Sequence, residues 1–129
     1  MRLLVYRKRE RAKRKPERVP RPKLHITKGD TVVVISGEEK GKRGKVLRAI
    51  PQKQQVVVEG LNIAKKHRKA RQQGEEPQIV EFAAPMSVSK VMLIDPKDDR
   101  PTRVRRRIDK DGTVERVSVR SGEPIPRTR

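Results

Sequence analysis

Leu, Ile, Val and Phe, the side chains that build a hydrophobic core, are few in this chain and unevenly distributed. They make up 31 of 129 residues, about 24%, and 26 of the 31 lie within residues 24–119. That share is just above the roughly 20% below which chains tend to be disordered. Sixteen of these residues are valines, whose branched Cβ suits a strand better than a helix. We therefore expect one small β domain with polar ends.

The charge constrains the partner as strongly as the apolar content constrains the fold. Thirty-five Lys and Arg residues face 16 Asp and Glu residues, which gives a formal net charge of +19. A polyanionic partner is expected, because a chain that repels itself gains free energy by neutralising phosphates. The absence of cysteine excludes a disulfide framework, a thiolate metal site and a cysteine nucleophile. No stretch approaches the roughly 20 apolar residues of a membrane span.

The sign of the charge changes along the chain and suggests how it is divided. Residues 1–23 carry a net charge of +9 and read as a basic N-terminal arm, which could be disordered alone and ordered on nucleic acid. Residues 24–73 form the expected barrel and a basic loop. Residues 74–120 hold an acidic linker, a strand and a C-terminal hairpin, and residues 121–129 form a tail. The acidic interval is expected to face away from the polyanion.

Short β-branched runs between turn residues predict the strands. The runs are residues 32–35, 46–50, 56–58 and 61–64, followed beyond the acidic linker by 88–94. Asp111–Gly112 is a hairpin turn signal, and it separates strands expected at residues 102–108 and 113–119. With no convincing helical pattern, these short strands and glycine turns predict an all-β fold, a small barrel.

A glycine-rich turn, residues 37–45, connects the first two predicted strands. Its three glycines allow positive φ, and it places Lys40, Lys42, Arg43 and Lys45 on an exposed loop. The glycines have neither the spacing of a Walker loop nor that of a dinucleotide fingerprint.

No residue pattern predicts catalysis, a cofactor or a metal site. His25 and His67 are isolated, and no Ser, His and acid set suggests a triad. Asp95, Asp98 and Asp99 lack the spacing of a calcium loop and read as a solvated turn. An enzyme is the remotest interpretation.

Alternating arginines mark the first strand of the predicted C-terminal hairpin. Alternation puts Arg103, Arg105 and Arg107 on one face, about 7 Å apart, near the spacing of successive phosphates. The same pattern fits a solvated edge strand that resists aggregation. The residues favour neither interpretation.

One stretch reads Lys28-Gly29-Asp30-x-Val32-x-Val34-Ile35-Ser36-Gly37-x-x-Lys40-Gly41-Lys42-x-Gly44-Lys45-Val46. This stretch resembles the KOW motif of small SH3-like barrels in ribosomal proteins and transcription elongation factors. Further matches follow in order, at Val56–Asn62, Lys65–His67, Ser89–Pro96, Pro101–Val104 and Ser121–Glu123. Together they are similar to the family of bacterial-type twenty-fourth proteins of the large ribosomal subunit. The resemblance covers residues 24–124, and residues 1–23 are longer than the few that usually precede the motif.

The resemblance implies an RNA-binding structural protein that binds the 5′ domain of the large ribosomal RNA, aids early assembly and lies near the polypeptide exit tunnel. Its partners would be ribosomal RNA and neighbouring ribosomal proteins, with no small-molecule substrate and no homo-oligomer. Its place would be the cytoplasmic ribosome rather than an organelle ribosome. The RNA contacts of the family fall here on Lys40, Lys42, Arg43 and Lys45, and then on Asn62, Lys65, Lys66, His67, Arg68 and Lys69.

Two other classes of binding protein are weighed against this one. A transcription elongation or antitermination module has the same barrel, but it usually follows a larger domain and carries less charge. A nucleoid-type DNA-binding protein would need a dimerising helix or a clear groove-sized ribbon, and the pattern gives neither. Aromatic residues are only 2% of the chain, so recognition should depend on RNA shape and phosphates rather than on base stacking.

Overall fold

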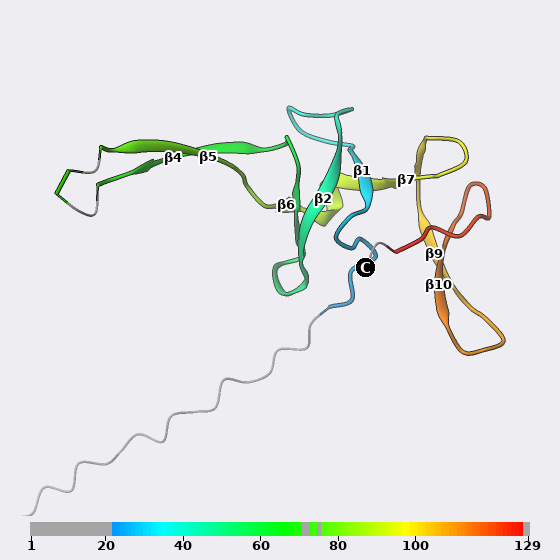
Figure 1. Ribbon diagram of the computed structural model, residues 1–129. Coiled ribbons are helices and arrows are strands. Elements are labelled where there is room, and N and C mark those ends of the chain that lie inside the picture. Colours follow the sequence, from blue (N-terminus) through cyan, green and yellow to red (C-terminus); the bar gives the residue numbers. More distant parts are fainter. Residues whose placement is uncertain (1–21, 71–72, 75, 128–129) are drawn as a thin grey trace, which may run out of the picture.

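The structure, a computed structural model, describes residues 22–70, 73–74 and 76–127 (Figure 1). Within these ranges all regular elements are strands or 3₁₀ turns, and no helix could cross a membrane. The strands are β1 Thr31–Val34, β2 Arg43–Ile50, β3 Gln55–Val58, β4 Ile63–Arg68, β5 Gln78–Ala83, β6 Met86–Ser87, β7 Val91–Ile94, β8 Pro101–Thr102, β9 Val104–Ile108 and β10 Val114–Ser118. The all-β prediction is confirmed. Apart from its last two residues, the predicted basic arm lies outside the described residues.

Six strands form one antiparallel sheet in the order β6-β3-β2-β1-β7-β8. β6 and β7 lie near opposite edges of that order, yet only the 3₁₀ turn Val88–Lys90 separates them in the chain. The Val88 amide donates to the Gln54 carbonyl beside β3, at 3.0 Å. The chain therefore draws the two edges together, and the sheet curls into a small barrel of the SH3-like kind that the motif predicts, although its hydrogen bonds do not close the ring.

The core is almost entirely aliphatic and lies inside this barrel. Its buried members are Ile26, Val32, Val34, Val46, Val56, Val58, Leu61, Met86, Val88, Val91 and Leu93. On β3 the buried positions alternate with more exposed ones, as the pleat of a strand requires, whereas the three valines of β1 are all buried. Because branched valines fill a pleated surface well, a chain with few large apolar residues still builds a dry centre.

The glycines of the turn between β1 and β2 serve two different purposes. Gly37 and Gly41 have φ values of 101° and 87°, the left-handed conformation that the sequence predicts for them. Gly44 does not have a positive φ, which corrects the expectation for the third glycine. A Cβ at Gly44 would lie 2.6 Å from Val58 Cγ1 and 2.8 Å from the Glu59 carbonyl oxygen. Glycine is needed at this position because β2 and the end of β3 approach closely.

Two separate hairpins extend from the barrel on opposite sides (Figure 1). One consists of β4 and β5, paired over six residues from Ile63 opposite Ala83 to Arg68 opposite Gln78. The other consists of β9 and β10, paired from Val104 opposite Ser118 to Ile108 opposite Val114. Each is a two-stranded sheet, a form that is only marginally stable by itself, so its placement depends on contacts at its base.

A buried ion pair fixes the β9–β10 hairpin to the barrel. The Arg116 guanidinium donates to Asp30 Oδ2 at 2.6 Å and to Oδ1 at 3.0 Å, and the two side chains are only 1% and 3% exposed. The same guanidinium donates to the carbonyls of His25, at 3.0 Å, and Pro126, at 2.8 Å. It thus joins the start of β1, the middle of β10 and the C-terminal segment.

Asp95 contradicts its predicted place in a solvated turn. Its side chain is fully buried and accepts hydrogen bonds from Ser118 Oγ at 2.5 Å, Ser121 Oγ at 3.0 Å and the Lys97 amide at 3.0 Å. These bonds, that of Ser118 above all, hold the pKa of the Asp95 carboxyl below its usual value. Asp98 and Asp99 are exposed, as expected. The hydroxyl donors are far away in the sequence, and they explain why Asp95 can be buried whereas Asp98 and Asp99 are not.

The predicted strands are found with shifted ends, and two strands, β5 and β6, were missed. The first, second and third are β1, β2 and β3, but the turn ends earlier than expected because β2 begins at Arg43. The expected strand at residues 61–64 begins and ends later, as β4, and residues 88–90 form a 3₁₀ turn before β7. β5 lies in the stretch interpreted as an acidic linker. The described part of the tail packs on β10, with Ile125 buried.

Candidate nucleic-acid interface

The glycine turn carries fewer of the predicted basic residues than the sequence indicated. Lys40 and Lys42 lie in the turn and are exposed. Arg43 and Lys45 belong to β2 and point outward, because they alternate with Gly44 and the buried Val46. The four side chains therefore continue from a loop onto the outer face of a strand, which holds the last two more rigidly than a loop would.

Two basic residues of this surface already have acidic partners. Lys42 Nζ lies 3.4 Å from Glu39 Oε1, and the Arg43 guanidinium pairs with the Asp99 carboxylate and donates to the Asp99 carbonyl at 2.9 Å. Both pairs are substantially exposed, and exposed pairs contribute only about 0–1 kcal/mol. Either cation can therefore exchange its carboxylate for a phosphate at small cost.

Asn62 connects the glycine turn to the β4–β5 hairpin. Its amide N–H donates to Glu39 Oε2 at 2.6 Å, and its side-chain amide donates to the Ala84 carbonyl at 3.1 Å. Its φ of 52° is left-handed, a conformation that asparagine tolerates better than most residues. The side chain of Asn62 thus holds the base of the hairpin, and Glu39 links that base to Lys42.

The basic stretch after Asn62 is a strand, which corrects its interpretation as a loop. In β4, Lys66 and Arg68 share one face with Ala64, and their partners across the sheet are Val80, Gln78 and Phe82. The missed signal is the β-prone run of Ile79, Val80 and Phe82, which supplies the second strand. A strand at this place sets the spacing of the cations instead of leaving them on a mobile loop.

The other face of the hairpin mixes the two charges. It carries Lys65 and His67, opposite Glu81 and Ile79, and Lys65 Nζ lies 3.1 Å from Glu81 Oε1. Part of the acidic interval, the strand β5, is therefore paired directly with the basic stretch; that this interval faces away from the polyanion stays a prediction. Lys69 follows β4 and is exposed. Among the described residues, Lys66, Arg68 and Lys69 have no carboxylate within 4.0 Å.

The three alternating arginines do not form one continuous row. Arg105 and Arg107 share a face of β9, whereas Arg103 lies between β8 and β9. All three are exposed, and Arg107 lies 3.1 Å from Glu115 Oε2 on β10. Both interpretations of these arginines, phosphate contact and solvated edge, fit this arrangement.

The described residues hold no group of three or more His, Asp or Glu side chains that could bind a metal ion. The surface is instead a set of exposed cations on a rigid aliphatic barrel. Its chemistry is that of a polyanion-binding surface, in which guanidinium and ammonium groups meet phosphate oxygens.

The comparisons with known proteins agree with the motifs. The family model described as "KOW motif" matches residues 28–59, and the model described as "Large ribosomal subunit protein uL24, C-terminal domain" matches residues 61–125. The large ribosomal subunit protein uL24 of Macrococcus caseolyticus is 53% identical over 102 residues, which cover 79% of this chain and 99% of that protein. Those of Erythrobacter litoralis and Thermobifida fusca are 50% and 48% identical, over 78% and 79% of this chain and 93% and 100% of theirs.

Proposed function

The chain belongs to the uL24 family of large ribosomal subunit proteins, and on that premise we propose that it binds the 5′ domain of the large ribosomal RNA, chiefly through phosphates. The family is one of structural ribosomal proteins, so the chain is a constituent of the large subunit and not an enzyme. The relatives are bacterial, which makes the cytoplasmic ribosome its place. Its other partners are neighbouring ribosomal proteins.

The observation that carries the RNA-binding proposal is the face of the β4–β5 hairpin with Lys66 and Arg68. Within the described residues these cations have no carboxylate partner, and the strand holds them two positions apart, about 7 Å, on one face. Such spacing suits successive phosphates of one RNA strand. The hairpin extends from the barrel, so it can follow RNA beyond the reach of the barrel itself (Figure 1).

The predicted RNA contacts fall into two groups by their present partners. Those with no carboxylate within 4.0 Å among the described residues are the first contacts that we propose: Lys40, Lys45, Lys66, Arg68, Lys69, Arg103 and Arg105. The second group must first exchange an acidic partner, and it consists of Lys42, Arg43, Lys65 and Arg107. Asn62 acts by positioning the hairpin, and His67 lies beside the cations of β4.

Early assembly and a position near the exit tunnel complete the proposal. A barrel that has its own aliphatic core can bind its RNA before the rest of the subunit is built. The binding of several RNA segments by one rigid body would hold those segments together. A projecting hairpin is suited to reach past the RNA surface toward an opening such as the exit tunnel.

Sedimentation of a cell lysate through a sucrose gradient tests the proposed function. We expect the chain to comigrate with the large subunit and to remain there after a wash with moderate salt. Its appearance only with RNA polymerase or bulk DNA would contradict the proposal and favour a transcription or nucleoid protein. Depletion of the chain should cause large-subunit precursors to accumulate, and unchanged subunit profiles would contradict the assembly role.

A further inference from the structure

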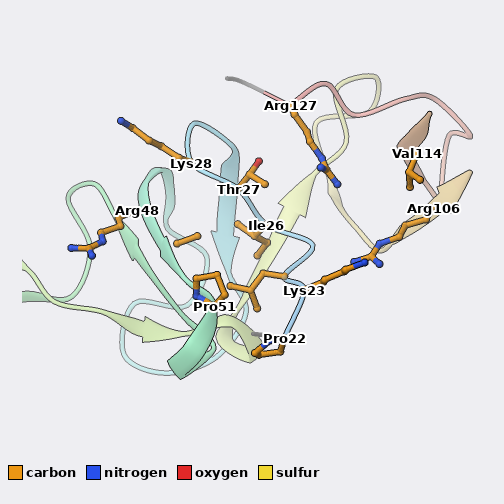
Figure 2. Close-up of a pocket in the computed structure, with 12 residues that line it drawn as sticks. Pro22, Lys23, Ile26, Thr27, Lys28, Arg48, Pro51, Arg106, Val114 and Arg127 are labelled. Atoms are coloured by element: carbon orange, nitrogen blue, oxygen red, sulfur yellow. The ribbon is translucent and has the colours of Figure 1, made fainter. Parts of the chain in front are cut away.

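A cleft of about 720 Å³ lies between the barrel and the β9–β10 hairpin, on the side away from the β4–β5 hairpin (Figures 1 and 2). One wall is the segment before β1, a second is the end of β2 with Pro51, and a third comes from the β9–β10 hairpin and the C-terminal segment. None of the residues discussed above as RNA contacts lines it.

Five cationic side chains surround the cleft: Lys23, Lys28, Arg48, Arg106 and Arg127. No acidic residue is part of its lining, and within the described residues none of the five has a carboxylate within 4.0 Å. Figure 2 shows Lys23 and Arg106, from facing walls, directed into the space between them. Cations that converge without compensation create a strong positive potential, and an anion in the cleft would relieve their repulsion.

His25, which adjoins the cleft, has a lowered pKa. Burial, followed by Arg116 and Arg106, lowers the pKa of this imidazole, which lies between the lining residues Leu24 and Ile26. The ring is therefore neutral near pH 7 and adds no sixth charge.

The buried ion pair of Arg116 and Asp30 connects three segments beside the cleft: the segment before β1, β10 and the C-terminal segment. Arg116 holds the carbonyl of His25 in the first wall and the carbonyl of Pro126, the residue before Arg127. It lies two residues from Val114, which lines the cleft. Because the walls are fixed before any ligand arrives, little ordering entropy is lost on binding.

Much of the lining of the cleft is apolar. Leu24, Ile26, Ala49, Pro51 and Val114 contribute to this apolar lining, and Ile26 is also part of the barrel core. A free phosphate would leave this surface wet, whereas a nucleotide unit places a sugar and a base edge beside its phosphate. Three of the five cations are arginines, whose planar fork matches the oxygens of a phosphate in a bidentate way.

We propose that this cleft is a further RNA-binding site, which takes the sugar–phosphate backbone of a single RNA segment against its apolar lining. The inference rests on the proposed function and extends it: the protein binds RNA on both sides of the barrel. An acidic segment of a neighbouring protein is the competing ligand. The absence of any acceptor side chain for peptide N–H groups other than Thr27 favours RNA.

The first test removes two cleft cations and compares the result with a matched control. Arg48→Gln/Arg106→Gln and the control Lys53→Gln/Lys110→Gln lose the same charge, and the control residues are exposed and outside the cleft. The probe is a transcript of the 5′ domain of a bacterial large ribosomal RNA. We expect the cleft variant to bind at least about tenfold more weakly, with a log K against log salt slope smaller in magnitude by about 2 than that of the control.

The second test introduces a carboxylate by one substitution, either at Val114, which begins β10, or at Val119, which follows it. Val114 and Val119 are 50% and 46% exposed, but only Val114 lines the cleft. Val114→Glu should weaken RNA binding, and Val119→Glu should change it much less. Because both positions are half exposed, both variants should fold, and their thermal unfolding confirms it.

Equal affinities of the cleft variants and their controls, with wild-type protein still bound to the transcript, would overturn the cleft inference alone. Loss of binding to poly-glutamate by the cleft variants, with RNA affinity unchanged, would assign the cleft to an acidic protein segment and also overturn it. A wild-type protein that does not bind the transcript would instead overturn the proposed function, and the cleft inference with it.

Discussion

Arg116 and Asp30 are buried charges, whereas the other ion pairs of the described residues are partly exposed, and this difference decides what their removal costs. Arg116→Met would leave the Asp30 carboxylate buried without a cation, and Asp30→Asn would do the same to the guanidinium. Each should lower the free energy of unfolding by about 3–5 kcal/mol. Arg107→Met, which removes an exposed pair with Glu115, should cost at most about 1 kcal/mol.

Urea unfolding of the two single variants and of Asp30→Asn/Arg116→Met measures this coupling. We expect the double variant to lose clearly less than the sum of the single losses, because it leaves no uncompensated charge. Additive losses would mean that the two side chains stabilise the fold independently.

The lowered pKa of Asp95 predicts that the stability of the fold decreases in acid. Its pKa is lower in the folded chain than in the unfolded chain, because Ser118 donates to it, so the unfolded state takes up this proton first as the pH falls. The contribution of the Asp95 carboxylate to the free energy of unfolding is therefore complete above the ordinary pKa of aspartate, and it is lost as the pH falls below that value. The stability difference between wild type and Asp95→Asn should narrow as the pH is lowered from about 5 to about 2.5. A constant difference in urea unfolding across this range would contradict the assignment.

Gly44 should tolerate no side chain. A Cβ there meets a backbone oxygen of Glu59, which cannot move away as the end of a side chain can. Gly44→Ala should cost about 1–3 kcal/mol in thermal or urea unfolding. Lys45→Ala, at the next and outward position, should stay within about 0.5 kcal/mol of wild type. Equal effects would mean that β2 shifts freely against β3.

At the scale of elements, the β4–β5 hairpin should act through one face. Lys66→Gln/Arg68→Gln should weaken binding to the 5′-domain transcript and reduce the magnitude of its salt slope by about 2, since each phosphate contact contributes about one unit. The pair Lys53→Gln/Lys110→Gln is again the control, with the same loss of charge outside the hairpin face. An unchanged slope would indicate that this face of the hairpin does not touch RNA.

The elements that the sequence predicts are those whose pattern is local. Runs such as Val32–Val34 and Val56–Val58 fill a buried strand, and Gly112, with a φ of 78°, makes the predicted turn before β10. β5 was missed because Glu81 and its acidic neighbours dominate the composition, although Ile79 and Phe82 give a strand pattern. Its apolar side chains stay exposed, so no core position indicated it.

The candidate site was predictable as a set of basic residues but not as an arrangement. The sequence could not pair Arg43 with Asp99 or Lys65 with Glu81, because those partners are distant along the chain. For the same reason the five cations of the cleft, which come from four separate segments, did not stand out among the 35 Lys and Arg residues of the chain. Burial of Asp95 also depends on a hydroxyl from another strand.

At the scale of the whole molecule, a rigid barrel carries cations on opposite sides. The glycine turn and the β4–β5 hairpin form one basic region, and the cleft beside the β9–β10 hairpin forms another (Figure 1). With one Phe, one Tyr and no Trp in the chain, base stacking can contribute little. The free energy of binding should therefore come mainly from counterions released by phosphates.

The dependence of RNA affinity on salt tests this central claim most directly. If about 8 phosphates are contacted, the plot of log K against log salt for the 5′-domain transcript should have a slope on the order of −6 to −7. Duplex DNA of equal length should bind more weakly at the same salt concentration. A slope shallower than about −2, or a preference for duplex DNA, would contradict binding of folded ribosomal RNA through its phosphates.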